Sequence, residues 1–435
     1  MLDKTIKKSH LYLILSFAAQ IVVGAVLLKS PLVEFKGHLE WLDALFTSTS
    51  AVCLVGLTSV PVNSFDLTGQ IVIIMLMQFG GLGMMTITAS VVLLLRHNFS
   101  WQNKKMLSIV NANFPLHNIQ DLNRFVITYS LTLELLGVIL MFPGFLFLEK
   151  CTVGESIHYS FFLSVSAFCN AGFSPLPNSL VGVSTYLKLV VCTLIICGGL
   201  GFCAIYDIVN RRRGTQLQIN TKIILVTTLF LIITGALAIK GLEWMGYDPE
   251  LPWIDALFQS ITSRTAGFNT VDIPALRSST LFVIALLMFI GASPNSTGGG
   301  IKTTTFAIVL LSIWSVCRGR NKLILWKREI SPQFLLNALA IMMTFIILAI
   351  ICSVFLATAV DSNMTFKKIS FEVVSALTTT GLSLGYTPEA APYGKMALIV
   401  CMFLGRLGPF SVFMFLVART KPVTLSYPEE PVNLI

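Results

Sequence analysis

The sequence predicts an all-α polytopic membrane protein built from four similar, parallel repeats. Hydrophobic residues make up 55% of the chain and charged residues 12%, and the mean hydropathy is +0.81, which is far from the average soluble domain. Eight apolar segments reach the roughly 20 residues that a spanning helix needs. A short motif that ends on glycine recurs four times between these segments.

The apolar segments account for most of the chain. The first has no small-residue cleavage site behind it, so we expect a retained helix rather than a signal peptide. No linker rich in Pro, Gly or Ser and no long polar stretch separates the segments, so residues 1–435 are expected to form a single membrane domain. The segments lie at about 11–28, 69–95, 122–148, 185–210, 220–240, 279–317, 334–360 and 394–418.

Lys and Arg residues gather on one side of this arrangement. Eighteen of the 30 lie on the side that carries residues 4–8, 96–124, 211–222, 318–328 and 419–421, ten lie on the other side, and Lys302 and Arg406 are expected inside the membrane. Loops that remain in the cytoplasm carry this excess, so both termini are expected to be cytoplasmic in a multi-pass protein of the plasma membrane. The net charge of +9 is therefore a topology signal that predicts contact with anionic membrane lipid and no nucleic-acid partner.

The recurring motif lies in the connection within each pair of apolar segments. It reads SAVCLVGL at 50–57, SAFCNAGF at 166–173, ITSRTAGF at 261–268 and SALTTTGL at 375–382. A second glycine follows at a similar distance inside the next segment, at Gly80, Gly198, Gly291 and Gly405. We therefore expect helix–pore-loop–helix repeats around a central pore, at about 10–95, 122–210, 220–317 and 334–418, with a cytoplasmic tail at 419–435.

A short amphipathic phrase precedes the motif. WLDALF at 41–46 and WIDALF at 253–258 each place an aspartate near the start of a predicted short helix, where a carboxylate favours the positive end of the helix dipole. Glu155 and Glu372 stand in the comparable stretches of the second and fourth repeats. The opposite, negative end of each short helix would face the centre of the membrane and favour a cation there.

After each short helix the chain must return through the membrane without helical hydrogen bonds. Such backbone survives at this depth only where protein or a water-filled path satisfies its carbonyls, and a ring of carbonyls can replace the hydration shell of a cation. Glycine permits torsions that allow all the carbonyls to face the axis. The alternative, that these glycines only let helices pack, explains four aligned occurrences poorly. The predicted filter residues, and the only predicted metal-ion site, are Leu54, Val55, Gly56, Asn170, Ala171, Gly172, Thr265, Ala266, Gly267, Thr379, Thr380 and Gly381.

Two features depart from the apolar pattern inside the membrane. Where the other inner segments run on as apolar sequence, residues 291–305 read GASPNSTGGGIKTTT, with one proline and three consecutive glycines that interrupt a helix. Arg406 lies near the bilayer centre, where an arginine costs about 2.5–3.5 kcal/mol and is expected to face a cavity or a partner. Glu134 is expected to be either a buried interhelical contact or a functional group.

With these motifs the sequence resembles the Trk/Ktr/HKT superfamily of potassium transporters, and within it the Ktr-type membrane subunits. The resemblance covers essentially the whole chain, through FLGRLGPFSVF at 403–413. It implies K⁺ uptake through the filter, with glycine in all four loops favouring K⁺ over Na⁺. It also implies an intramembrane gate beneath the filter that consists of Ser296, Thr297, Gly298, Gly299, Gly300, Lys302 and Arg406.

The resemblance implies partners as well. They are a second copy of the chain, giving a homodimer with one pore in each protomer, and a cytoplasmic nucleotide-binding regulator ring of the KtrA/TrkA kind. No covalent cofactor is implied; K⁺ is the transported ion and Na⁺ a candidate activator. Leu54 departs from the pattern, because the three matching positions are polar, which costs little if only backbone oxygens coordinate the ion.

Two other classes of protein are less consistent with the sequence. An enzyme would need a nucleophile with a base or paired carboxylates, and the chain has no HExxH or GxSxG motif and only isolated acids in its spans, so we expect no catalytic site. A Na⁺- or H⁺-coupled secondary transporter is the alternative, although inverted repeats alternate in orientation whereas these four do not. The nine cysteines form no CxxC pair and are expected to be small buried hydrophobes.

Overall fold

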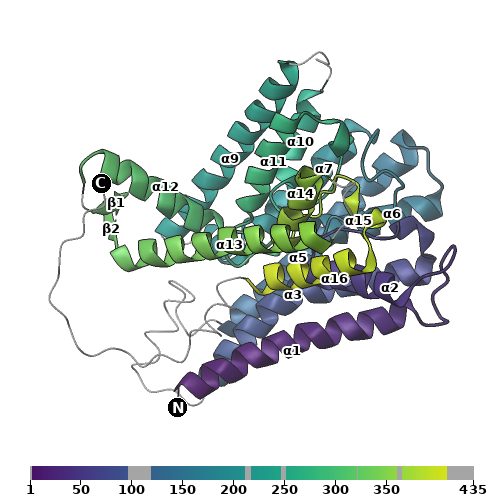
Figure 1. The fold of residues 1–435 in the computed structure, drawn as a ribbon, viewed down its shortest axis with the longest axis horizontal. Helices are drawn as coiled ribbons and strands as arrows, with labels where there is room; N and C mark the ends of the chain where they lie inside the picture. Colours follow the sequence, from purple (N-terminus) through teal and green to yellow (C-terminus); the bar gives the residue numbers. More distant parts are fainter. Residues whose placement is uncertain are drawn as a thin grey trace.

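A computed structural model describes residues 2–96, 119–210, 217–245, 251–320, 322–359 and 365–408 (Figure 1). These residues are mostly helical. The predicted cytoplasmic tail at 419–435, the end of the last apolar segment and the basic residues within 97–118 and 211–216 lie outside the described residues.

The first half of the chain contains two groups of helices. The first group consists of α1 (Leu2–Leu28), α2 (Trp41–Cys53), the 3-10 turn η1 (Val62–Ser64) and α3 (Leu67–Arg96). The second consists of α5 (Ile119–Pro143) with its π-helical extension η3 (Gly144–Leu148), α6 (Val153–Phe168), α7 (Thr185–Gly199) and α8 (Phe202–Asn210).

The second half repeats this order of a long helix, a short helix and a further helix. The third group consists of α9 (Ile219–Trp244), α10 (Trp253–Thr262), the 3-10 turn η5 (Ile273–Ala275), α11 (Ser278–Phe289) and α12 (Thr303–Cys317). A hairpin of β1 (Leu323–Leu325) and β2 (Arg328–Ile330) follows, with Leu323 opposite Ile330. The fourth group consists of α13 (Pro332–Ala359), α14 (Phe366–Leu377), α15 (Tyr386–Glu389) and α16 (Pro392–Leu407).

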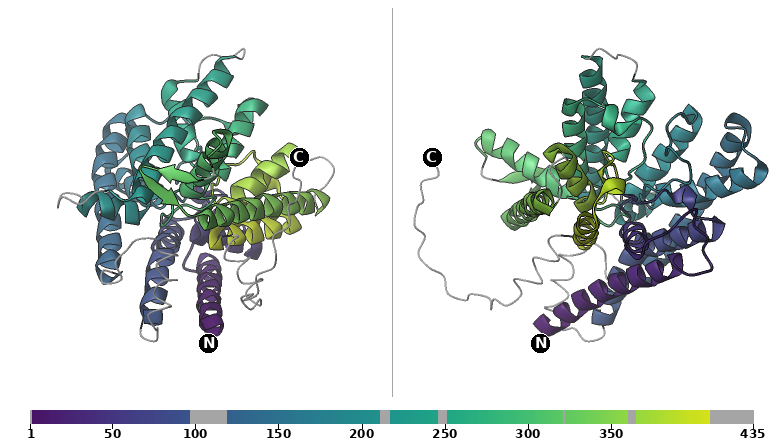
Figure 2. Two further views of the ribbon diagram at one scale, coloured as in Figure 1. Left: turned by 90° about the vertical axis from the view of Figure 1, so that its left-hand side faces the viewer. Right: turned by 45° about the vertical axis from the view of Figure 1, so that its right-hand side comes forward.

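The four groups contact one another in a closed cycle. Within each group the short helix packs against both of its longer neighbours. We call α3, α7, α11 and α16 the third helix of their groups and leave the short turn α15 out of this count. Between groups, the third helix of one packs against the short helix of the next, in the pairs α3 with α6, α7 with α10, α11 with α14 and α16 with α2. Figure 2 shows the yellow α16 beside the purple α2, although the two helices come from opposite ends of the chain.

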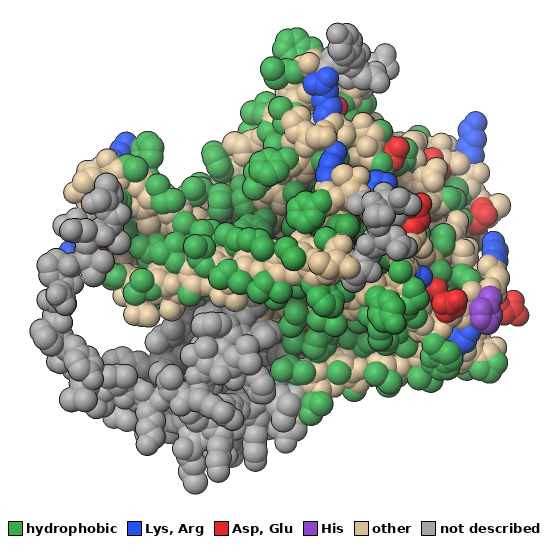
Figure 3. Space-filling model, in the orientation of Figure 1, with side chains coloured by type: hydrophobic (Ala, Val, Ile, Leu, Met, Phe, Trp, Pro, Cys, Tyr) green, Lys and Arg blue, Asp and Glu red, His purple; other side chains and the backbone are tan. Residues whose placement is uncertain are grey.

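The short helices are more deeply buried than the long helices. The short helices α2 and α6 bury most of their residues, including serines and threonines, whereas α13 exposes large apolar side chains such as Ile347, Ile350 and Phe355. Figure 3 shows hydrophobic side chains over α13 and α16, with charged side chains gathered towards the right-hand edge. Contiguous apolar surface on this scale is typical of contact with lipid.

Three helices of the described chain are long and apolar enough to cross a membrane: Arg124–Leu148, Ile219–Trp244 and Pro332–Thr358. The pair α7 and α8 would add a fourth span, but it bends by 93° at its break. The predicted total of eight spans therefore stays a prediction. The expectation that segment 185–210 runs on as one helix is wrong, because the helix stops at Gly199 and restarts at Phe202.

Candidate functional site

The twelve residues predicted to form the filter adopt one repeated backbone conformation. We call Leu54–Gly56, Asn170–Gly172, Thr265–Gly267 and Thr379–Gly381 the four glycine turns. The third residue of each has a φ between 73° and 91°, and the first has a φ between 53° and 78°. Side chains other than glycine rarely adopt such angles, so the leucine, asparagine and two threonines at the first position are held there by their surroundings.

The short helices set this conformation. In the first turn the Val55 amide donates to the Ser50 carbonyl at 2.9 Å, and in the fourth the Thr380 amide donates to the Ser375 carbonyl at the same distance. In the third turn the Ala266 amide donates to the Thr262 carbonyl, which lies four residues back and not five, so this turn is one residue shorter. Position for position, Thr262 therefore matches Ser50, whereas alignment of the sequences on glycine pairs Ser50 with Ile261.

The four glycine turns meet in a ring. A Cβ atom built on Gly56 would lie 2.6 Å from the Ala171 carbonyl oxygen, and one on Gly172 would lie 2.6 Å from the Ala266 carbonyl oxygen. A Cβ on Gly267 would collide with the Thr380 carbonyl, and one on Gly381 with the Val55 carbonyl, which closes the ring. Each glycine therefore faces the carbonyl that precedes the next glycine, and no side chain fits at any of the four positions.

Arg406 and the segment between α11 and α12 lie next to the ring. The helix break between Phe289 and Thr303 confirms the predicted interruption. A Cβ on Gly298 would collide with the Thr265 hydroxyl and one on Gly299 with the Thr379 hydroxyl. These two hydroxyls are buried and have no hydrogen-bond partner among the described residues.

The broken helices α7/α8 and α11/α12 fit into each other. The Ser293 amide donates to the Gly199 carbonyl at 3.1 Å, and the Phe202 amide donates to the Asn295 carbonyl at 2.9 Å. Gly201 has a φ of 85°, and a Cβ there would collide with the Pro294 carbonyl. Each break supplies hydrogen-bonding groups that the other lacks, which is the physical reason why the second group is interrupted as well as the third.

Arg406 is buried and has hydrogen-bond partners, which agrees with the expectation that it faces a cavity or a partner. Its Nη1 donates to the Thr297 carbonyl at 2.5 Å and its Nη2 to the Gly80 carbonyl at 2.6 Å. Lys302 donates from Nζ to the Gly298 carbonyl at 2.7 Å. Ser296 differs from the rest of the predicted gate, because its hydroxyl donates at 2.6 Å to Ser293 within the segment and not towards the ring.

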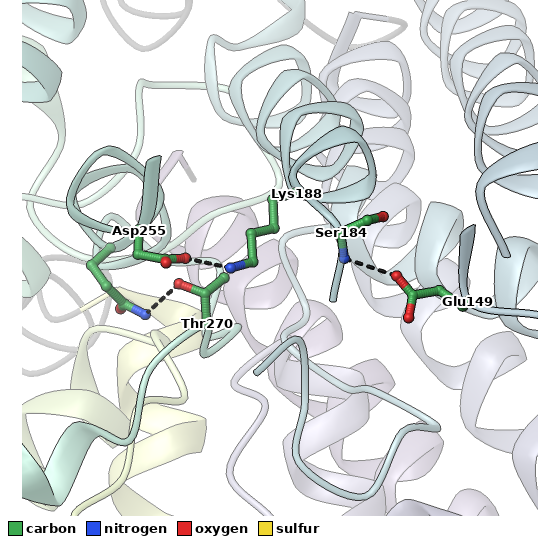
Figure 4. Close-up of polar contacts among 6 residues, drawn as sticks. Glu149, Ser184, Lys188, Asp255 and Thr270 are labelled. Atoms are coloured by element: carbon green, nitrogen blue, oxygen red, sulfur yellow. Dashed lines mark hydrogen bonds and ion pairs between the residues drawn. The ribbon is translucent and has the colours of Figure 1, made fainter. Parts of the chain in front are cut away.

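Sequence reasoning did not find two lysines, one buried and one half-buried, that bind the aspartates of the short helices. Lys188 Nζ lies 2.6 Å from Asp255 Oδ1, and Lys395 Nζ lies 2.6 Å from Asp43 Oδ1. Figure 4 shows Lys188 of α7 and Asp255 of α10 pointing towards each other. A shared pattern could have identified the lysines, because each follows a tyrosine by two residues at the start of its helix, in TYLK and PYGK.

Glu372 lies in the short helix of its group, the stretch that the sequence indicates, but not in the first turn of that helix. Glu372 lies in the middle of α14 and is fully buried, and its carboxylate accepts hydrogen bonds from Ser383, Leu384, Tyr386 and Thr387. It thus organises the chain that follows the fourth turn. Glu155 does lie in the first turn of α6, where hydrogen bonds from Thr152 lower the pKa of the Glu155 carboxyl.

Glu134 makes the buried interhelical contact that the sequence left as one of two roles. Gln78 Nε2 of α3 donates to both carboxylate oxygens of Glu134 on α5, at 3.0 Å each. The Cys169 thiol donates to Gln78 Oε1 at 3.6 Å, which links the carboxylate to the residue before the second turn.

Comparison with known proteins supports the resemblance. Residues 12–422 match the family model TrkH, described as a cation transport protein. The chain is 35% identical to the Ktr system potassium uptake protein B of Bacillus subtilis over 427 residues, which cover 96% of this chain and 94% of that protein. It is 33% identical to the Ktr system potassium uptake protein B of Vibrio alginolyticus, with 97% and 93% covered.

A solved structure shares the fold. The crystal structure of the potassium transporter TrkH from Vibrio parahaemolyticus superposes with a TM-score of 0.74 at 18% sequence identity. The alignment covers 94% of this chain and 85% of that one. The helical architecture described above is therefore that of a known fold.

Proposed function

The chain belongs to the TrkH family of cation transport proteins, and from this premise we propose that it is a potassium-uptake membrane subunit whose four glycine turns form the selectivity filter. Its relatives are transport proteins, so the chain is not an enzyme. K⁺ enters the proposal because two relatives that match nearly the whole chain are named potassium uptake proteins.

The closed ring of glycine turns is the observation that carries the proposal. Four repeats surround one axis in it, and each contributes the carbonyl before its glycine, namely Val55, Ala171, Ala266 and Thr380. A ring of backbone carbonyls can replace the hydration shell of a cation without a charged side chain. Leu54 shares the φ of its three polar counterparts, which agrees with coordination by the backbone alone.

The segment between α11 and α12 is the gate in this proposal. Gly298 lies against Thr265, the first residue of the third turn, and Gly299 lies against its counterpart Thr379 in the fourth turn. In this position the segment blocks the path below the filter. Arg406 holds the segment through the Thr297 carbonyl and places a positive charge near the path, and Lys302 braces the segment from within through the Gly298 carbonyl. A fixed cation repels K⁺, and opening requires the segment to leave Arg406.

The assembly is part of the proposal. The protein functions in the plasma membrane with both termini in the cytoplasm, as a homodimer that binds a cytoplasmic nucleotide-binding regulator ring. The names of the relatives, each a component of a Ktr system, support a multi-component assembly. Activation by Na⁺ is a further element to be tested with the same assembly.

Uptake in a cell that lacks its own K⁺ uptake systems tests the function. Expression of the chain with a candidate regulator should restore growth at low K⁺ and produce Rb⁺ uptake that exceeds Na⁺ uptake. Cells that express membrane-inserted protein with the regulator and still show no uptake of either ion would contradict the proposal. Flux that follows the K⁺ gradient without fixed Na⁺ or H⁺ stoichiometry would separate conduction from the coupled alternative.

A further inference from the structure

Two ion pairs, one buried and one partly buried, join neighbouring groups at equivalent places in the ring. Lys188 comes from the third helix of the second group and Asp255 from the short helix of the third group. Lys395 comes from the third helix of the fourth group and Asp43 from the short helix of the first. Both pairs have a nitrogen to oxygen distance of 2.6 Å, and they occupy opposite contacts in the cycle of four.

The sequence positions of the four residues are also equivalent. Lys188 precedes Gly198 by ten residues, and Lys395 precedes Gly405 by ten. Asp43 precedes Ser50 by seven residues, and Asp255 precedes Thr262, the structural match of Ser50, by seven. The two ion pairs are therefore one feature that occurs twice.

The other two contacts between groups, α3 with α6 and α11 with α14, have no ion pair at the equivalent position among the described residues. Gln70, ten residues before Gly80, lies 2.7 Å from His158 of α6 through Oε1 and Nε2. Leu281, ten residues before Gly291, lies in an apolar cluster with Phe371 of α14. Charge thus occurs at alternate contacts, on the first and third short helices.

The pairs are shielded from solvent. The side chains of Lys188 and Asp255 are 9% and 8% exposed, and those of Lys395 and Asp43 are 14% and 10% exposed. Charge-assisted hydrogen bonds in such surroundings are short and strong, and loss of one partner leaves the other charge buried without compensation. The carboxylates of Asp255 and Asp43 are buried and paired with lysines, so they do not form an exposed acidic surface that attracts cations to the pore entrance.

Each aspartate lies in the first turn of a short helix, and the glycine turn follows the other end of the same helix. A helix transmits a displacement along its axis, because its backbone hydrogen bonds resist stretching. A fixed first turn therefore fixes the depth at which the glycine turn presents its carbonyls. Two of the four turns are fixed in this way against the helix that precedes them in the cycle.

We infer that Lys188–Asp255 and Lys395–Asp43 are positioning pairs that set the spacing of the carbonyl ring and hence the preference for K⁺ over Na⁺. The inference rests on the proposed filter. Selection between ions of different radius depends on where the carbonyls lie and how far they can move, so release of a short helix acts on selectivity more than on total flux.

A double-mutant cycle at each pair tests the inference. Lys188→Met and Asp255→Asn alone should each lower the ratio of Rb⁺ to Na⁺ uptake by about tenfold, since each leaves one buried charge unpaired. The double variant should lose no more selectivity than the worse single variant, because one interaction is removed in all three. Lys395→Met and Asp43→Asn should behave alike.

The chain offers a matched control in Lys322 and Glu329, an ion pair at 3.1 Å whose side chains are 66% and 50% exposed. Lys322→Met should leave the uptake ratio unchanged. Where a neutral variant does not fold, Lys188→Arg and Asp255→Glu keep both charges and change the geometry, and they should shift the ratio in the same direction by less.

The outcomes separate the inference from the proposed function. A wild-type chain without Rb⁺ uptake contradicts the proposed function itself. With selective wild-type uptake, folded single variants that keep the wild-type ratio overturn the inference. Losses that add in the double variant also overturn it, because the two residues would then act independently.

Discussion

At the scale of single residues, the site requires glycine wherever a side chain would collide with a neighbouring carbonyl or hydroxyl oxygen. The four glycines of the turns face carbonyl oxygens, and Gly298 and Gly299 face threonine hydroxyls, at separations that leave no space for a Cβ atom. The residue type at these positions is therefore determined by contact between distant segments as well as by local torsion.

The ring contact gives a first prediction. Gly56→Ser or Gly381→Ser should loosen the selection of K⁺ over Na⁺, because the added atoms push the neighbouring carbonyl out of the ring. The ratio of Rb⁺ to Na⁺ uptake measures this effect. Gly182→Ser is the control, since Gly182 has a φ of 79° but open space around its Cα atom, so it adds backbone strain without a collision. Unchanged selectivity in both filter variants would contradict the filter assignment.

A second prediction concerns Arg406. Replacement by glutamine removes the positive charge and the hydrogen bonds to Thr297 and Gly80, so the segment should open more often and K⁺ uptake without a regulator should rise. Uptake must be normalised to folded protein in the membrane. If Arg406 only braces the fold, the variant will lower the amount of assembled protein and leave uptake per molecule no higher.

At the scale of elements, two broken helices act as one structural unit. The loop between α11 and α12 uses the carbonyl of Gly199 and the amide of Phe202, and these groups are free to bind it because α7 and α8 are separated there. A helix interruption inside a membrane needs such partners, so the two breaks depend on each other.

This dependence gives a third prediction. Gly201→Ala should weaken the closed arrangement, because its Cβ would displace the Pro294 carbonyl and alanine disfavours a φ of 85°. We expect higher K⁺ uptake without a regulator, and a larger increase when several residues between 296 and 300 are deleted. No increase in either variant, with folded protein present, would show that this segment does not limit conduction.

At the scale of the whole molecule, the cycle of four groups closes only because α16 packs against α2. Large apolar side chains are exposed on the outside, and serines and threonines are buried beside the apolar core, which is unlike a soluble protein and suits a lipid bilayer. Lengths and composition identify three or four spans in the described residues, whereas the sequence predicts eight.

The span count gives a fourth prediction. With eight spans and the observed distribution of Lys and Arg, both termini should be cytoplasmic. A green fluorescent protein fused to either end should fluoresce in a bacterial cell, and a periplasmic reporter such as alkaline phosphatase should be inactive at both ends. Fluorescence at one end and phosphatase activity at the other would require an odd number of spans and would contradict the repeat boundaries.

Part of the site could be predicted because its signals are local. Glycine spacing located all four turns, the Pro and Gly residues located the helix break, and the cost of a buried arginine identified Arg406 as a residue with a partner. The position of Glu372 within its short helix could not be predicted, because an acidic residue in such a stretch looks the same whether it lies in the first turn or the middle of the helix. The bend at Gly201 was missed because its cause is Pro294, which is far away in the sequence.

The sequence by itself determined that the chain is a helical membrane protein with four repeats of one motif, because hydropathy and backbone freedom are properties of the residue types. Only the tertiary structure decided that the turns form a closed ring, that Lys188 and Lys395 neutralise Asp255 and Asp43, and that two interrupted helices complete each other. These contacts join segments from different repeats. Their geometry depends on how the helices pack, and the residue pattern of one segment does not specify which other segment will contact it.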